Sequence, residues 1–190
     1  FEICKMKTHA LENITGAIKN QYGFVAGAHK TKGHAQYANS NKFAGMLADL
    51  NKCIGIKYGI DGVNVSMAIA YRTVEGQIFV EVVRIQSTRT GTNWIVDWLK
   101  GAKDINSIVI DGASGQTMLS EAIKEAKIKT PVIFPKVGEI ITANSEFEQA
   151  VFNGGICHKA QPSVVQVVTN CDKRAIGANG GFGYKSLKHL

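Results

Sequence analysis

Residues 107–127 read SIVIDGASGQTMLSEAIKEAK, and this stretch indicates the class of fold. The apolar run 108–110 predicts a buried strand that ends at Asp111. A Gly-rich turn over 112–115 follows, and then apolar residues recur at helical spacing, which predicts an amphipathic helix over 114–127. A carboxylate is therefore expected where a strand meets a loop, the edge at which α/β proteins place their ligands.

The chain before this stretch predicts three antiparallel strands joined by short turns. The expected strands cover residues 53–60, 65–71 and 77–85. The first of them ends at the pair Asp61-Gly62. A helix is then expected over 92–101, with Thr92 as its N-cap and Gly101 as its end.

The chain after this stretch predicts alternating strands and helices. A short strand is expected over 132–134, between two prolines. A helix is expected over 163–171, although the valines there would also fit a strand. Another helix is expected over 145–153, because Ser145 and Glu148 have the spacing of a capping box. The resulting order, β-β-β-α-β-α-β-α, is that of a ribonuclease-H-like fold. We expect an α/β protein with a mixed sheet, three antiparallel strands followed by alternating helices and strands, flanked by helices.

The same order predicts a site that contains Asp61 and Asp111. In this fold the first and fourth strands lie side by side, so acids at their ends become neighbours. Two close carboxylates repel unless a cation joins them, and Mg²⁺ prefers oxygen ligands. The other interpretation is that both are turn residues, since Asp-Gly is a common turn pair. The topology favours the metal site.

Residues 1–50 differ in composition from residues 51–190, which we expect to form the ribonuclease-H-like domain. The first segment is rich in Ala, Gly, Asn, Lys and His. Loose helical spacing over 10–18 and 42–50 predicts a helical N-terminal arm or linker, with a basic stretch at 28–41 between the helices.

The overall charge favours a polyanionic partner. The chain carries 22 Lys and Arg against 15 Asp and Glu, a net charge of +7, and its pI is about 9.2. Nucleic acid fits this balance. No apolar run approaches the ~20 residues of a membrane span, so no membrane partner is expected. The four cysteines form no C-x-x-C pair, which argues against a zinc or redox motif.

The Gly-rich stretch GANGGFGYKS at 177–186 fails the pattern of a nucleotide-binding P-loop. We expect a basic loop that contacts DNA or the active site. His158, in GGICHKAQP, is equally consistent with a site residue and with an ordinary loop histidine.

Four stretches resemble the C-terminal nuclease domain of the large terminase subunits of tailed bacteriophages. They are YGID at 58–61, VIDGASGQTMLSEAI at 109–123, the segment 131–170, and RAIGANGGFGYKS at 174–186. The resemblance covers about two thirds of the chain. It implies an endonuclease that cuts concatemeric viral double-stranded DNA with two Mg²⁺ or Mn²⁺ ions.

By residue, the resemblance assigns Asp61 and Asp111 to metal binding. Lys185 matches a lysine near the family's site, and His158 is a further accessory candidate. The family's third acid follows that lysine, but residues 186–190 (SLKHL) contain no acid. Asp172 is the alternative within the chain.

The resemblance also implies partners and a location. They are a packaging ATPase domain, a small terminase subunit and a portal protein, in the cytoplasm of an infected host. Two other classes remain open: another ribonuclease-H-like nuclease, such as a resolvase or a transposase-like enzyme, and a non-catalytic DNA-binding or assembly module.

Overall fold

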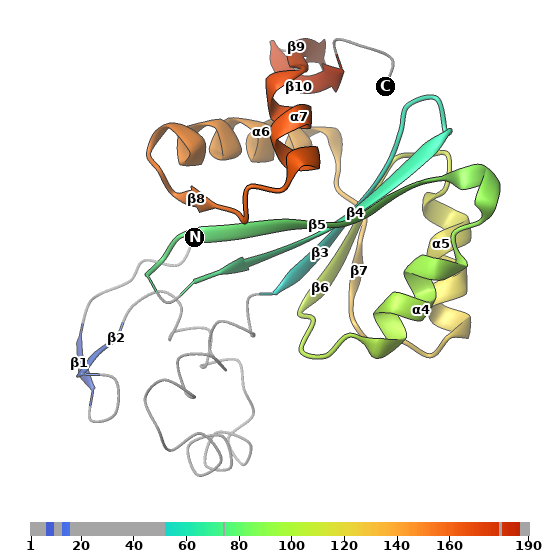
Figure 1. The fold of residues 1–190 in the computed structure, drawn as a ribbon, viewed down its shortest axis with the longest axis horizontal. Helices are drawn as coiled ribbons and strands as arrows, with labels where there is room; N and C mark the ends of the chain where they lie inside the picture. The colour runs from blue at the N-terminus through green and yellow to red at the C-terminus, as the bar shows by residue number, and fades with distance from the viewer. Residues whose placement is uncertain (1–6, 10–12, 16–51, 74, 179, 187–190) are drawn as a thin grey trace.

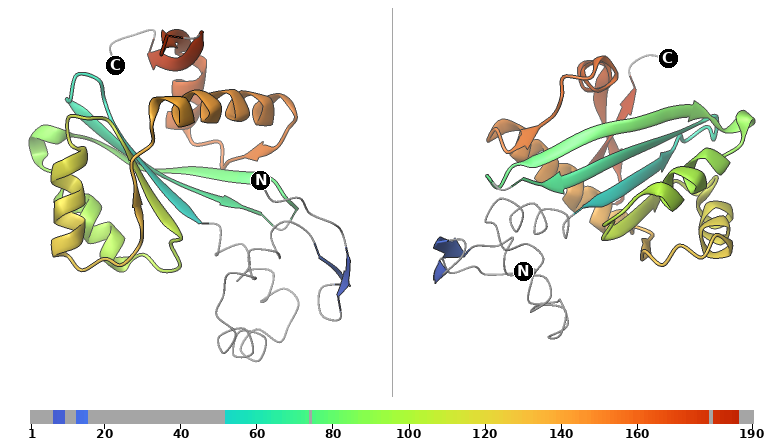
Figure 2. Two further views of the ribbon diagram at one scale, coloured as in Figure 1. Left: turned by 180° about the vertical axis from the view of Figure 1, so that it is seen from behind. Right: turned by 60° about the horizontal axis from the view of Figure 1, so that its bottom comes forward.

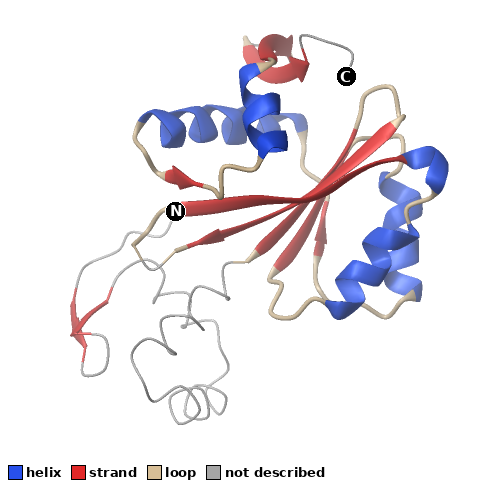
Figure 3. Cartoon of the chain, in the orientation of Figure 1, coloured by secondary structure: helices blue, strands red, loops and turns tan. Residues whose placement is uncertain are grey.

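A computed structural model describes residues 7–9, 13–15, 52–73, 75–178 and 180–186. Within them, a twisted mixed sheet runs through the molecule and carries helices on both sides (Figure 1; Figure 3). None of the described helices has the length and apolar character needed to cross a membrane.

The central sheet has six strands in the order β7-β6-β3-β4-β5-β8. Strands β3, β4 and β5 form the expected antiparallel meander, whereas β6 pairs with β3 in parallel. Short strands β7 and β8 extend the two edges in parallel. The strands are β3 (Cys53–Tyr58), β4 (Asn64–Arg72), β5 (Ile78–Ser87), β6 (Ser107–Asp111), β7 (Val132–Ile133) and β8 (Ile156–Cys157). The predicted mixed α/β architecture is confirmed.

Helices α4 (Asn93–Gly101) and α5 (Gln116–Glu125) lie together on one side of the sheet (Figure 1). On the other side lie α6 (Val137–Phe152), α7 (Pro162–Thr169) and a separate hairpin of β9 (Cys171–Ile176) and β10 (Gly181–Ser186). Views from behind and below show the same separation (Figure 2). A 3₁₀ turn, η2 (Thr88–Thr90), follows β5.

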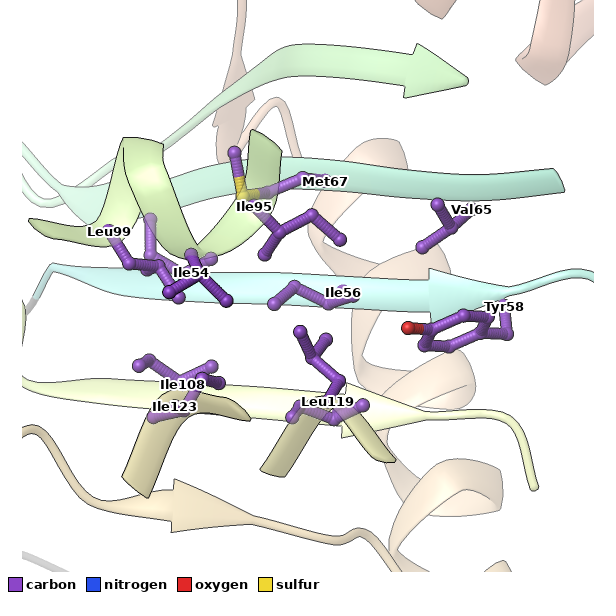
Figure 4. Close-up of a cluster of buried hydrophobic side chains, with 12 residues drawn as sticks. Ile54, Ile56, Tyr58, Val65, Met67, Ile95, Leu99, Ile108, Leu119 and Ile123 are labelled. Carbon is purple, nitrogen blue, oxygen red and sulfur yellow. The ribbon is translucent and has the colours of Figure 1, made fainter. Parts of the chain in front are cut away.

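The hydrophobic core lies between the sheet and the α4–α5 pair (Figure 4). Strand β3 shows why: its burial alternates, with Ile54, Ile56 and Tyr58 buried and the residues between them exposed. The matching positions of the neighbouring strands and of the two helices complete the cluster. Its other members are Val65, Met67, Ile95, Val96, Leu99, Ile108, Ile110, Leu119 and Ile123.

Helix α6 begins at Val137, so the prediction of a helix that starts at Ser145 was wrong. The capping residue is Lys136, whose backbone N–H donates to the side chain of Glu139 at 2.7 Å. Ser145 lies inside the helix, where its hydroxyl donates to the carbonyl of Ile141 at 3.2 Å. A hydroxyl can bond the preceding turn as well as cap a helix, so the spacing at Ser145 was misleading.

The C-terminal part also departs from prediction. The Gly-rich stretch was expected to be a loop, but its residues after 180 form β10, and positive φ angles at Gly177 and Gly180 turn the hairpin. The predicted helix over 163–171 ends at Thr169, and Cys171 already belongs to β9. The short edge strand β8 was not predicted, because two residues give no periodic pattern.

Near the N-terminus, β1 (Lys7–His9) pairs antiparallel with β2 (Asn13–Thr15). The prediction of a helix over 10–18 is therefore wrong at residues 13–15, where β-branched Ile14 and Thr15 favour a strand. The other expected features of residues 1–50, including the helix over 42–50 and the basic stretch, lie outside the described residues. The division at residue 50 stays a prediction.

Candidate functional site

A cavity of about 750 Å³ lies between the ends of β3 and β6, helix α6 and the β9–β10 hairpin. The strand ends supply the two predicted aspartates, Asp61 and Asp111. The hairpin supplies Arg174 and Lys185. Parts of the chain more than a hundred residues apart therefore meet in one cavity. The remaining lining residues are Lys57, Tyr58, Gly59, Ile60, Asn64, Ile140, Asn144, Ile176, Gly183, Tyr184 and Ser186.

Asp111 is the last residue of β6 and is the register partner of Lys57 in β3. The Lys57 ammonium forms an ion pair with the Asp111 carboxylate. The Asp111 side chain is 28% exposed, so the carboxylate is partly withdrawn from solvent while still facing the cavity. Sequence reasoning missed Lys57. Its signal was available, because Lys57 is a charged residue within an otherwise apolar strand and alternates with the buried positions.

Asp61 lies three residues beyond the end of β3 and is exposed. Its Oδ1 accepts a hydrogen bond from the backbone N–H of Val63 at 2.9 Å, so it does shape a turn. It also lines the cavity, and the two interpretations of this residue are compatible. The loops that carry the aspartates lie side by side, since a Cβ added at Gly62 would be 3.4 Å from the Cβ of Ser114.

Tyr58 holds the loop after Asp111 in place. Its side chain is 2% exposed, and burial is the main cause that raises the pKa of its phenol. A Cβ at Gly112 would lie 2.7 Å from the Cβ of Tyr58, and one at Gly115 would overlap the tyrosine ring. Gly112 also has a φ of 111°. The glycines after Asp111 are thus required for the backbone to pass over Tyr58.

The hairpin is attached to α6 by three polar contacts. The Asn144 side-chain amide donates to the carbonyl of Phe182 at 3.0 Å. Glu148 accepts from the Lys173 ammonium at 2.6 Å and from the Tyr184 hydroxyl at 3.4 Å. The Glu148 carboxylate raises the pKa of Lys173. These contacts place Arg174 and Lys185, which lie outside the central sheet, at the cavity.

The other two accessory candidates do not line this cavity. His158 follows β8, at the opposite edge of the sheet from β6, and its Nδ1 accepts from the N–H of Ala160 at 2.9 Å. Asp172 lies opposite Lys185 in the hairpin register, and its Oδ1 accepts from the N–H of Lys173 at 2.8 Å. Both hydrogen bonds are local turn or strand contacts.

The donor set of the cavity suits a hard divalent cation. Asp61 and Asp111 offer carboxylate oxygens, and Mg²⁺ is often held by one or two carboxylates together with water and substrate phosphate oxygens. Lys57 already balances part of the charge of Asp111. Within the described part of the chain, no group of three His, Cys, Asp or Glu residues is arranged to hold a metal.

Comparison with protein families gives one match. A family model described as "Domain of unknown function (DUF362)" matches residues 1–96, which is just over half of the chain. The chain belongs to this family. For this DUF362 member, the matched segment contains β3, β4, β5 and Asp61, but not Asp111. A comparison with curated proteins gives no match.

Among solved structures, the DUF362 chain is similar to the crystal structure of the HK97 bacteriophage large terminase. The TM-score is 0.58 at 14% sequence identity, and the match covers 70% of this chain. It covers 35% of the terminase chain, so this chain corresponds to about a third of that protein. Likeness at this identity shows that the fold is shared, as the element order predicted.

Proposed function

We propose that this chain is a metal-dependent endonuclease of the terminase type, which cuts concatemeric viral double-stranded DNA by hydrolysing phosphodiester bonds. The observation that carries the proposal is the meeting of Asp61 and Asp111 in one cavity. The similarity to a phage large terminase in fold supports it.

Asp61 and Asp111 would hold the Mg²⁺ or Mn²⁺. The bound metal would supply an activated water and would stabilise charge on the departing oxygen. The resemblance to terminase nucleases implies two metal ions, and we propose the same number here. Two carboxylates, one of them paired with Lys57, provide protein ligands for one ion more readily than for two. Calorimetric titration with Mn²⁺ in the presence of DNA would count them.

The chain's own cations would bind the substrate. Lys57, Arg174 and Lys185 line the cavity beside the two aspartates, and the net charge of +7 favours a polyanion. Contacts to backbone phosphates bind DNA without reading its sequence. The further proposed partners are a packaging ATPase domain, a small terminase subunit and a portal protein, in the cytoplasm of an infected host.

The deciding experiment is cleavage of supercoiled plasmid with Mg²⁺, with Mn²⁺ and with EDTA. Asp111→Asn and Asp61→Asn should each lower cleavage to about 1% of wild type or less, because each removes a carboxylate that would hold the metal ion. Asp97→Asn is the matched control, since Asp97 lies on α4 with a 71% exposed side chain and does not line the cavity. It should cut as the wild type does.

The results of the cleavage assay distinguish the candidate functions. Metal-dependent cutting that both cavity variants lose supports the nuclease, and normal cutting by both variants would refute the assignment of the site. Preference for a branched junction over linear duplex would favour a resolvase-like enzyme.

A non-catalytic DNA-binding module is the second candidate. It is favoured by the Lys57–Asp111 ion pair and by the lack of a three-ligand group among the described residues. Salt-sensitive DNA binding by the wild type, with no cutting in Mn²⁺, would support this alternative.

A further inference from the structure

The three cations that line the cavity differ in their partners. Lys57 is paired with Asp111. The side chains of Arg174 and Lys185 form no hydrogen bond or ion pair with another residue in the described parts of the chain. Two of the three positive charges are therefore available to an anion that enters the cavity.

Arg174 has a further property that points to a ligand. Its Nε is buried and has no hydrogen-bond partner among the described residues. Buried donors are normally satisfied, because leaving one without an acceptor costs stability. The planar guanidinium presents its donors as a fork that matches two oxygens of a phosphate. The terminal nitrogens of the guanidinium also have no partner among the described residues, and they would donate to a phosphate in the cavity.

The fold fixes the position of this guanidinium. Arg174 of β9 lies opposite Gly183 of β10, and both line the cavity. A Cβ at Gly183 would come within 3.3 Å of Ile176 and 3.6 Å of the Asn144 amide, so the glycine leaves room where the hairpin approaches α6. The preceding residue, Lys173, is held by Glu148 and by the face of the Phe182 ring, whose centroid lies 4.2 Å from the lysine Nζ.

We propose that Arg174, together with Lys185, forms a phosphate-binding site for the nucleic-acid backbone on the hairpin side of the cavity. The site shares its cavity with the carboxylates of Asp61 and Asp111, so a phosphodiester bound there would lie close to the acids. The identity of the substrate as DNA rests on the proposed function. The assignment of Arg174 to a phosphate oxygen rests on its half-buried, unpartnered guanidinium and on its place in the cavity.

The test is binding of a fluorescein-labelled linear duplex in EDTA, measured by fluorescence anisotropy at several salt concentrations. Arg174→Met should weaken binding about tenfold and should lower the slope of log affinity against log salt by about one. Arg174→Lys, which keeps the charge but loses the fork, should fall between this variant and the wild type. Arg72→Met is the control, because Arg72 lies at the far end of β4 from the cavity. It should bind as the wild type does.

Thermal unfolding distinguishes ligand binding from a structural role. Arg174→Met removes a buried donor without a partner, so its Tm should equal or exceed that of the wild type. A lower Tm with unchanged affinity for the duplex would show that Arg174 is structural and would overturn the proposal.

The phosphate site and the nuclease activity can be refuted independently. If Arg174→Met binds the duplex with the wild-type affinity and salt slope, the phosphate site is wrong whatever the cleavage assay gives. If the affinity falls as expected but the wild type does not cut plasmid with any metal, the phosphate site stands and the nuclease proposal fails.

Discussion

The two sides of the molecule are stabilised in different ways. The side formed by β3, β4, β6, α4 and α5 contains all of the buried hydrophobic core found in the described residues. On the other side, α6 and α7 contribute no buried residue. Large apolar side chains on those helices are well exposed, among them Phe152 at 73% and Val167 at 53%.

Polar and aromatic contacts take the place of a core on the second side. Glu148 links α6 to Lys173 and Tyr184, and the Phe147 and Phe182 rings each meet Tyr184 edge-on. Such contacts give orientation, while individual exposed ion pairs add little stability. The hairpin is therefore positioned by a few specific groups.

The candidate site spans this division. The carboxylates of Asp61 and Asp111 are placed by the sheet, whereas Arg174 and Lys185 are placed by the hairpin. Substitutions in the hydrophobic core of the first side should destabilise the fold and disrupt the site together. Substitutions on the second side should mainly lower the affinity for DNA. Three variants test this difference.

Ile108→Ala should have the largest effect. Ile108 is fully buried on β6 and lies near Ile123 of α5 (Figure 4). Removing its side-chain carbons leaves a cavity and should lower the free energy of unfolding by about 3 kcal/mol. Urea denaturation measures this change. The matched control, Val167→Ala on α7, should change it by less than about 0.5 kcal/mol. Similar losses in the two variants would contradict the comparison.

Gly115→Ala should have an intermediate effect. The added methyl group would overlap the Tyr58 ring, so either the ring or the loop after Asp111 must move. We expect a loss of about 1–3 kcal/mol in unfolding free energy, together with reduced plasmid cleavage. Gly138→Ala on α6 is the control, because a Cβ there meets nothing within 4 Å. It should be neutral or stabilising. A stable, fully active Gly115→Ala variant would show that Tyr58 does not position Asp111.

Glu148→Gln should have the smallest effect on stability. The Glu148 carboxylate raises the pKa of Lys173 above its ordinary value of 10.5. The stability that protonated Lys173 gains from this pair is therefore fully present below pH 10.5 and is lost only as the pH rises through the raised pKa of Lys173. The measurement is therefore made at neutral pH. We expect a Tm close to that of the wild type but duplex affinity lower by about twofold, because the hairpin is held less firmly.

Gln149→Glu is a suitable control for charge on α6, since Gln149 is exposed and adjacent to Glu148. If Glu148→Gln lowers the Tm as much as Ile108→Ala does, the hairpin contact is part of the structural core and the comparison fails.

Local patterns were sufficient to predict five of the six strands of the central sheet, all but β8. The stretch that ends at Asp61-Gly62 and the apolar run that ends at Asp111 predicted where β3 and β6 lie. The start of α6 was mispredicted because the cap at Lys136 depends on the side chain of Glu139. The β9–β10 hairpin was missed because the Gly-rich stretch at 177–186 was interpreted as a loop, although Phe182 and Tyr184 alternate with glycines in β10.

By itself, the sequence determined the order of strands and helices from β3 to α6 and the placement of Asp61 and Asp111 after two strands that a parallel pairing makes neighbours. Periodicity and turn residues carry that information, because burial against one face imposes a repeat on the chain. Only the tertiary structure decided that Lys57 pairs with Asp111 and that Arg174 reaches the same cavity. Those relations depend on strand register and on the docking of the hairpin against α6. Such contacts join residues far apart in sequence and leave no periodic signal.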